Sequence, residues 1–228
     1  MKKVIFVAGP PGSGKTEFIK KYKFNNCKVF DLDNYRSLSQ YAYNCDPLNY
    51  SENTTYNAGQ LMNQDINENL LNDLPIVIET TFSSKNNTFE QIKDDNRYDI
   101  SVYLFIVNKI EAFLSVLERC IVDYINGKTC RLIRFEKFID KINFYETYID
   151  NIKKYNINIH YVVRNGDSVS ILNEFTSLNI QYDINDYEDR INNIRCFCNL
   201  NNIHDIELEL DKLINYYCDY KIKRRKIL

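Results

Sequence analysis

The chain has 228 residues, of which 44% are hydrophobic and 26% charged, which is enough apolar material for one well-filled core. Only six glycines and four prolines, together with an aromatic content of 14%, exclude collagen-like, linker-like and disordered chains. The 29 basic and 31 acidic side chains give a formal net charge of −2, which provides no global attraction to nucleic acid or to an anionic membrane.

The first apolar run, Val4–Ala8, is too short for a secretory signal because Gly9 and two prolines follow it. No later stretch approaches the ~20 apolar residues that a membrane span requires. The seven cysteines include no C-x-x-C pair, so we expect reduced, packed thiols. These features predict a soluble, cytoplasmic protein without a membrane partner.

Short apolar runs alternate with amphipathic stretches along the chain. The runs predict strands at Val4–Ala8, Cys27–Phe30, Pro75–Glu79, Ile100–Val107 and Ile157–Val163. Helical periodicity predicts helices at Lys15–Lys23, Tyr56–Leu71, Ile110–Tyr124, Phe135–Tyr155, Tyr187–Leu200 and Asp205–Lys226. This order predicts an α/β fold with a doubly wound, mostly parallel sheet. We expect one α/β domain over residues 1–180 and a helical C-terminal extension over residues 181–228, packed on it or appended to it.

A phosphate-binding loop is predicted between the first strand and the first helix, where the sequence fits G-x-x-x-x-G-K-[ST]. The residues expected to bind the nucleotide are Gly9, Pro10, Pro11, Gly12, Ser13, Gly14, Lys15 and Thr16. The glycines let successive N–H groups point at one anion, Lys15 supplies a charge to the β- and γ-phosphates, and the Thr16 hydroxyl is a ligand for Mg²⁺. The strand-loop-helix context predicts a P-loop protein that binds ATP or GTP.

The acceptor of the phosphoryl group is not identified by the loop, since motors, GTPases and small-molecule kinases share it. A GTPase needs N-K-x-D, and Glu111 stands where Asp is required after Asn108 and Lys109. The missing Asp disfavours a GTPase.

A candidate general base follows the second strand in the sequence Asp31-Leu-Asp33-Asn-Tyr-Arg36. Residues just past the carboxyl end of a parallel strand face the ligand crevice. A strand end would point Asp31 and Asp33 to the same side, and Asp33 is the better placed to accept a proton from an acceptor hydroxyl. Arg36 is a candidate for steadying the charge of the acceptor. The alternative is that Asp33 is an Asx-type helix cap.

The third strand runs into Glu79-Thr80-Thr81. An acid at the end of a buried strand beside a P-loop can hold Mg²⁺ through water, and threonine hydroxyls can position an acceptor. We therefore select Glu79 and Thr81, with a simple helix or turn start as the alternative for the threonines. After the fifth predicted strand, Arg164 and Asn165 are candidates for a loop that covers the adenine.

These motifs together resemble the zeta-toxin family of P-loop kinases, within a wider group that includes polynucleotide 5′-hydroxyl kinases. The matching pieces are the P-loop, Asp31–Arg36, the strand with Glu-x-Thr at Ile76–Thr81, and Arg119 with a further arginine about a dozen positions on. The resemblance runs from residue 1 to roughly residue 170. It implies transfer of phosphate from ATP or GTP to a sugar hydroxyl of UDP-N-acetylglucosamine, and an antitoxin partner.

The same resemblance implies roles for individual residues. Asp33 would be the base, Glu79 and Thr81 would line the acceptor site, and Arg119 and Arg131 would stabilise the charge on the transferring phosphoryl group. The second arginine is Arg131 or Arg134, and Arg119 has the alternative of a surface residue paired with Glu118 or Asp123. A polynucleotide 5′-kinase and a non-catalytic nucleotide-binding regulator remain alternative functions.

Overall fold

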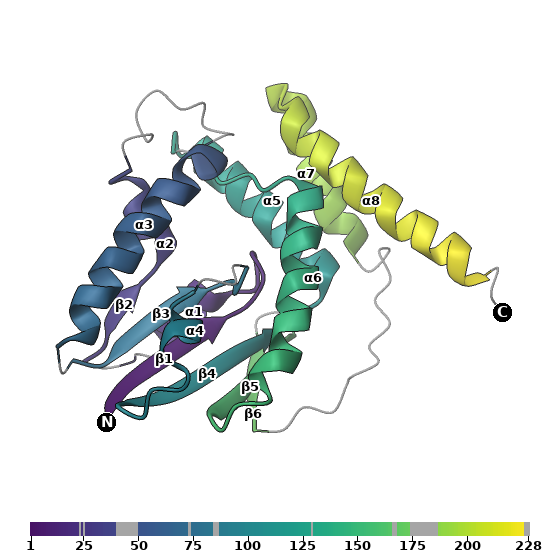
Figure 1. The fold of residues 1–228 in the computed structure, drawn as a ribbon. Helices are drawn as coiled ribbons and strands as arrows, with labels where there is room; N and C mark the ends of the chain where they lie inside the picture. The colour runs from purple at the N-terminus through teal and green to yellow at the C-terminus, as the bar shows by residue number, and fades with distance from the viewer. Residues whose placement is uncertain are drawn as a thin grey trace.

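A six-stranded sheet forms the centre of the protein, with the strand order β2-β3-β1-β4-β5-β6 (Figure 1). The computed structural model describes residues 1–22, 24, 26–39, 50–72, 74–83, 87–128, 130–165, 168–173 and 187–225. The strands are β1 (Lys2–Ala8), β2 (Lys28–Phe30), β3 (Ile76–Thr80), β4 (Tyr98–Ile106), β5 (Asn158–Asn165) and β6 (Ser168–Leu172). The first five are parallel, and β6 pairs antiparallel with β5. The predicted mostly parallel α/β sheet of the P-loop kinase type is confirmed.

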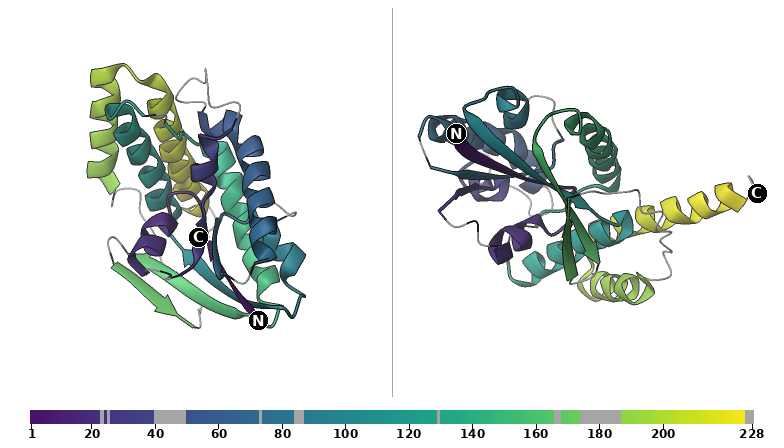
Figure 2. Two further views of the ribbon diagram at one scale, coloured as in Figure 1. Left: turned by 90° about the vertical axis from the view of Figure 1, so that its left-hand side faces the viewer. Right: turned by 90° about the horizontal axis from the view of Figure 1, so that it is seen from below.

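Helices cover both faces of this sheet (Figure 2). They are α1 (Lys15–Tyr22), α2 (Leu32–Arg36), α3 (Tyr50–Leu70), α4 (Thr88–Ile92), α5 (Lys109–Ile125), α6 (Phe135–Ile152), α7 (Glu188–Asn201) and α8 (His204–Arg225). Alternate residues of β1 point to opposite faces: Val4 and Phe6 pack in one core with α3, α4 and α6, while Ile5 and Val7 pack in another with α1. Burial on both faces explains why β1 is an unbroken apolar run.

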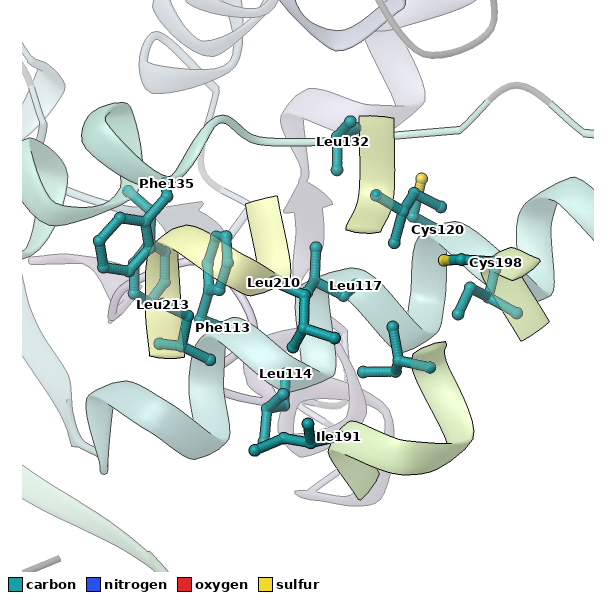
Figure 3. Close-up of a cluster of buried hydrophobic side chains, with 14 of the residues drawn as sticks. Phe113, Leu114, Leu117, Cys120, Leu132, Phe135, Ile191, Cys198, Leu210 and Leu213 are labelled. Carbon is teal, nitrogen blue, oxygen red and sulfur yellow. The ribbon is translucent and has the colours of Figure 1, made fainter. Parts of the chain in front are cut away.

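The C-terminal helices α7 and α8 share a third core with α5 and α6. Figure 3 shows side chains of this core, among them Leu114 and Leu117 of α5, Ile191 of α7 and Leu210 of α8. The predicted helical C-terminal extension is therefore present and packed on the rest of the protein. None of the helices in the described ranges is both long and apolar enough to span a membrane.

Three short elements were not predicted: α2, α4 and β6. The first two are helices of five residues each, too short to show an amphipathic period. Strand β6 forms a hairpin with β5, in which Asn165 is opposite Ser168. The expectation of a loop at Arg164 and Asn165 was therefore wrong. The dipeptide Asn165-Gly166 between two apolar runs was the signal for this hairpin.

Candidate active site

The P-loop connects β1 to α1 at the carboxyl end of the sheet. Gly9 N–H donates to the Thr80 carbonyl of β3 at 3.1 Å, which fixes the start of the loop to the sheet. Gly12 has a φ of +77°, and a Cβ there would lie 2.0 Å from the carbonyl oxygen of Ala112 in α5. Only glycine is compatible with this positive φ and with so close an approach. The loop is thereby held against the first turn of α5.

Lys15, Thr16 and Glu79 form a compact group beneath the loop. Lys15 is 6% exposed, and its Nζ donates to the Pro10 carbonyl at 3.1 Å and lies 3.8 Å from Glu79 Oε1. Thr16 Oγ1 donates to Glu79 Oε2 at 2.9 Å. Burial raises the pKa of Glu79 and lowers the pKa of Lys15, because burial disfavours both charged forms.

The oxygen donors of this group suit a magnesium ion. A hydroxyl and a carboxylate are hard ligands, and Mg²⁺ in phosphate sites takes one or two protein ligands beside the phosphates. Thr16 and Glu79 are therefore the residues that fit the predicted metal. Glu79 lies next to Thr16 at the P-loop, and its predicted role in holding Mg²⁺ stays a prediction.

Asp31 and Asp33 belong to a strand end and a helix, not to one continuous strand end as predicted. Asp31 is the N-cap of α2, and its Oδ1 accepts from Asp33 N–H at 3.0 Å. The sequence analysis considered a helix-capping role for Asp33 as the alternative, and in the structure Asp31 has this role. Asp33 lies in the first turn of α2, and both carboxyl groups line the same cleft.

Arg36 holds α2 to α3. Its Nε donates to Asp33 Oδ1 at 2.9 Å, and its Nη1 donates to the hydroxyls of Thr54 and Thr55 at 3.0 and 2.9 Å. The side chain is 7% exposed and reaches the cleft wall. Arg36 therefore orients Asp33, whereas its predicted contact with the acceptor stays a prediction.

The two candidate arginines between α5 and α6 point in different directions. Arg131 Nη1 contacts Asp33 Oδ2, and its Nε lies 3.9 Å from Asp123 Oδ2. Arg134 instead pairs with Glu209 and Asp205 of α8, at 3.4 and 3.7 Å. The structure thus brings Arg131 into the cleft and directs Arg134 to the C-terminal helix.

Arg119 reaches the cleft from α5. Two partners were considered for it in the sequence. Glu118 binds Arg190 of α7 at 2.6 Å. Asp123 is near enough for the charge of Arg119 to oppose the rise in the Asp123 pKa that burial causes. Within the described residues, the buried Nε of Arg119 has no hydrogen-bond partner. Arg119 therefore borders the cleft, and its contact with the transferring phosphoryl group stays a prediction.

Thr81 lies where β3 leaves the sheet. The next residue, Phe82, is 1% exposed and has a φ of +46°, and its N–H donates to Thr80 Oγ1 at 3.0 Å. This turn sends Phe82 into the core and leaves Thr81 at the cleft, where its hydroxyl is 2.8 Å from Ser83 Oγ.

One cleft of about 740 Å³ is bordered by Lys15, Thr16, Asp31, Asp33, Arg36, Glu79, Thr81, Arg119 and Arg131. Its size suits a nucleotide together with a second small molecule. Three further basic residues line it: Lys20 of α1, Arg164 of β5, whose Nε lies 3.9 Å from Glu111 Oε1, and Lys141 of α6. The sequence analysis missed Lys141. The sequence feature that could have identified it is the position of this lysine on the apolar face of α6, between Phe138 and Ile142.

Comparisons with known proteins identify the family and the fold of the chain. The sequence profile of the zeta toxin family matches residues 1–176. No curated protein matches the chain. Among solved structures, one from the PezAT chromosomal toxin-antitoxin system of the human pathogen Streptococcus pneumoniae has a TM-score of 0.60 at 17% identity, covering 85% of this chain and 87% of that chain.

Two AvrRxo1-ORF1:AvrRxo1-ORF2 structures are also similar. The one with sulphate ions has a TM-score of 0.53 at 12% identity and covers 83% of this chain and 63% of that chain. The one with ATP has a TM-score of 0.52 at 11% identity and covers 75% of this chain and 57% of that chain. At such low identity the structural likenesses show a shared fold.

Proposed function

This chain belongs to the zeta toxin family and is a P-loop kinase, and we propose that it transfers the γ-phosphate of a nucleoside triphosphate to a sugar hydroxyl of a nucleotide sugar such as UDP-N-acetylglucosamine. The observation that carries the proposal is the position of Asp33 on the same cleft as Lys15, between Arg36 and Arg131. A carboxylate so placed can act on an acceptor hydroxyl that faces the γ-phosphate.

In the proposed reaction, Asp33 accepts the proton of the acceptor hydroxyl as its oxygen bonds to the γ-phosphorus. The bond from the γ-phosphorus to the β,γ-bridging oxygen breaks, and ADP leaves. Two guanidinium groups close to Asp33 favour its ionised form, which is the form that can take a proton. Arg36 and Arg131 also hold the carboxylate in one orientation.

The phosphates would be bound by the N–H groups of the P-loop and by Lys15. Arg119 and Arg131 would neutralise charge on the transferring group, because a planar guanidinium can bridge two phosphate oxygens. Thr16 and Glu79 would hold Mg²⁺, which supplies positive charge to the β- and γ-phosphates when bound. Thr81 and Arg36 would contact the acceptor.

The proposal includes three further points. The donor is ATP or GTP, since the P-loop itself does not read the base. The location is the cytoplasm, where these nucleotides are available. An antitoxin is a proposed partner, because a structural relative comes from a toxin-antitoxin system. The proposed contact with an antitoxin is not assigned to any of the segments that the structure describes.

The test is phosphoryl transfer from γ-labelled Mg-ATP to UDP-N-acetylglucosamine and, in parallel, to a 5′-hydroxyl oligonucleotide. Asp33→Asn should lower the rate on the true acceptor by about 10²- to 10⁴-fold while ATP still binds, because the amide cannot take a proton. Asp150→Asn, an exposed aspartate near the end of α6, is the matched control and should leave the rate unchanged.

Label on the nucleotide sugar that is lost in Asp33→Asn would support the proposal. Label on the oligonucleotide alone would contradict it and favour the polynucleotide kinase. ATP binding with label on neither acceptor would also contradict the proposed acceptor class. Turnover that survives in Asp33→Asn would contradict Asp33 as the base.

A further inference from the structure

Lys141 occupies a position on α6 that faces the cleft. One turn later on the same helix, Tyr145 places its hydroxyl 2.9 Å from the Ala8 carbonyl and 3.2 Å from the Phe105 carbonyl. These contacts fix this face of α6 over the carboxyl ends of β1 and β4, where the P-loop begins. Phe138, one turn earlier, is fully buried. Lys141 lies between them and lines the cleft.

Among the described residues, none forms an ion pair or a hydrogen bond with the ammonium group of Lys141. Burial lowers the pKa of Lys141, and the nearby cations Arg36, Lys15 and Lys137 lower it further. A half-buried cation among other cations is unfavourable until an anion joins it.

Lys141 lines the same cleft as the proposed base Asp33 and its partner Arg36. Arg36 is bonded to Asp33. The phosphates of the nucleotide already have the P-loop, Lys15 and Arg119. An anion at Lys141 therefore fits best as part of the second substrate.

We propose that Lys141 binds an anionic group of the acceptor, such as its diphosphate, and so selects charged acceptors over neutral sugars. This inference rests on the proposed function, because it assigns Lys141 to the acceptor of that reaction. It predicts that a nucleotide sugar binds through Lys141, and that N-acetylglucosamine, which has no phosphate, is a poor acceptor.

The kinetic test compares Lys141→Met with the wild-type protein. Methionine keeps the unbranched length and removes the charge. The KM for UDP-N-acetylglucosamine should rise about 10- to 100-fold, since hydrogen bonds to charged groups are strong. The KM for ATP should change less than about threefold. Lys141→Arg should restore part of the affinity, and Lys137→Met, at an exposed position of α6, is the matched control.

A binding measurement keeps the inference separate from the proposed function. Binding of uridine 5′-diphosphate is measured with a non-hydrolysable ATP analogue held in the P-loop, so that no turnover is needed. Weaker binding to Lys141→Met than to the wild type supports the anion site even if UDP-N-acetylglucosamine receives no label. Equal binding, or no binding to the wild type, overturns it. A rise in the KM for ATP equal to that for the acceptor also overturns it.

The substitution should not unfold the protein. Replacing a half-buried, unpaired ammonium by an apolar side chain is expected to leave the Tm unchanged or to raise it. A variant that is at least as stable, yet binds the diphosphate less tightly, separates a binding role from a structural one. A lower Tm with unchanged binding would assign Lys141 to packing and overturn the inference.

Discussion

Arg131 contacts the carboxylate of Asp33 although the two residues are 98 positions apart in the sequence. The contact joins the segment before α6 to the helix that follows β2. It places a guanidinium group at Oδ2 of the proposed base, whereas Arg36 binds Oδ1. A cation there can stabilise both the ionised base and the charge of the transferring group.

Arg131→Met should lower kcat by about 10²- to 10³-fold with little change in the Kd for ATP, because it removes one preorganised charge. Arg134→Met is the matched control: it leaves the cleft intact and should lower the Tm by weakening the contact with α8. Steady-state kinetics and thermal unfolding of both variants make the comparison. If Arg134→Met lost as much kcat as Arg131→Met, the assignment of the cleft arginine would be wrong.

Gly12→Ala should abolish nucleotide binding. The added Cβ would meet the Ala112 carbonyl at 2.0 Å, and the residue would have to keep a φ of +77°. Gly59→Ala is the matched control because a Cβ at Gly59 meets no atom within 4 Å. Alanine in the interior of α3 should raise the free energy of unfolding by about 0.5–1 kcal/mol. Titration with a fluorescent ATP analogue and chemical denaturation measure the two effects.

Glu209 is a fully buried carboxylate that receives the Phe135 N–H at 2.6 Å and the Lys212 Nζ at 3.1 Å, in addition to Arg134. It caps the start of α6, where the residue at the N-cap supplies no side-chain hydrogen bond. Glu209→Ala should lower the free energy of unfolding by about 3 kcal/mol, because it leaves these donors unsatisfied.

Glu209→Gln keeps an oxygen that can accept from Phe135 and should be less damaging than Glu209→Ala. Urea denaturation curves give both values. A loss below about 1 kcal/mol in Glu209→Ala would show that water or another group replaces the carboxylate.

Asp31 provides a test of pH dependence. Its pKa is raised above the usual value, chiefly by burial, although Arg131 and Lys15 oppose the shift. The native state therefore holds this proton more tightly than the unfolded chain does. The wild-type protein gains stability from it at low pH and loses that stability as the pH rises from the usual pKa of 3.8 through the raised native value.

Asp31→Asn cannot titrate, yet its amide oxygen can still accept from the Asp33 N–H. Its free energy of unfolding relative to the wild type should therefore rise as the pH increases above the usual Asp pKa of 3.8 and through the raised native value. Denaturation at several pH values measures this difference. A difference that is constant across the range would contradict the raised pKa.

The P-loop and the sheet around it could be predicted because both depend on local sequence. A glycine-rich motif between an apolar run and an amphipathic stretch indicates a loop that connects a strand to a helix. Unbroken apolar runs such as Val4–Ala8 indicate strands that are buried on both faces. The positions of Lys15, Thr16 and Glu79 follow from this frame, because strands β1 and β3 are neighbours and end together.

The remainder of the site depends on contacts between distant segments. The choice between Arg131 and Arg134 was open in the sequence, since three positions separate them in an irregular stretch. It is decided by Glu209 and Asp205 on α8, which bind Arg134. The sequence analysis placed Asp31 and Asp33 together at a strand end for a related reason. A helix of five residues is too short to show a helical hydrophobic pattern, so the end of β2 before Asp31 could not be predicted.

The core shared by α5, α7 and α8 extends beyond the part of the chain that resembles other zeta toxins. A polypeptide cut at residue 176 would expose Leu114 and Leu117 of α5, which are fully buried beneath α7 and α8. A new apolar surface on a soluble helix promotes aggregation. For recombinant work, the shortest fragment that stays in solution is therefore expected to be longer than the region the family profile covers.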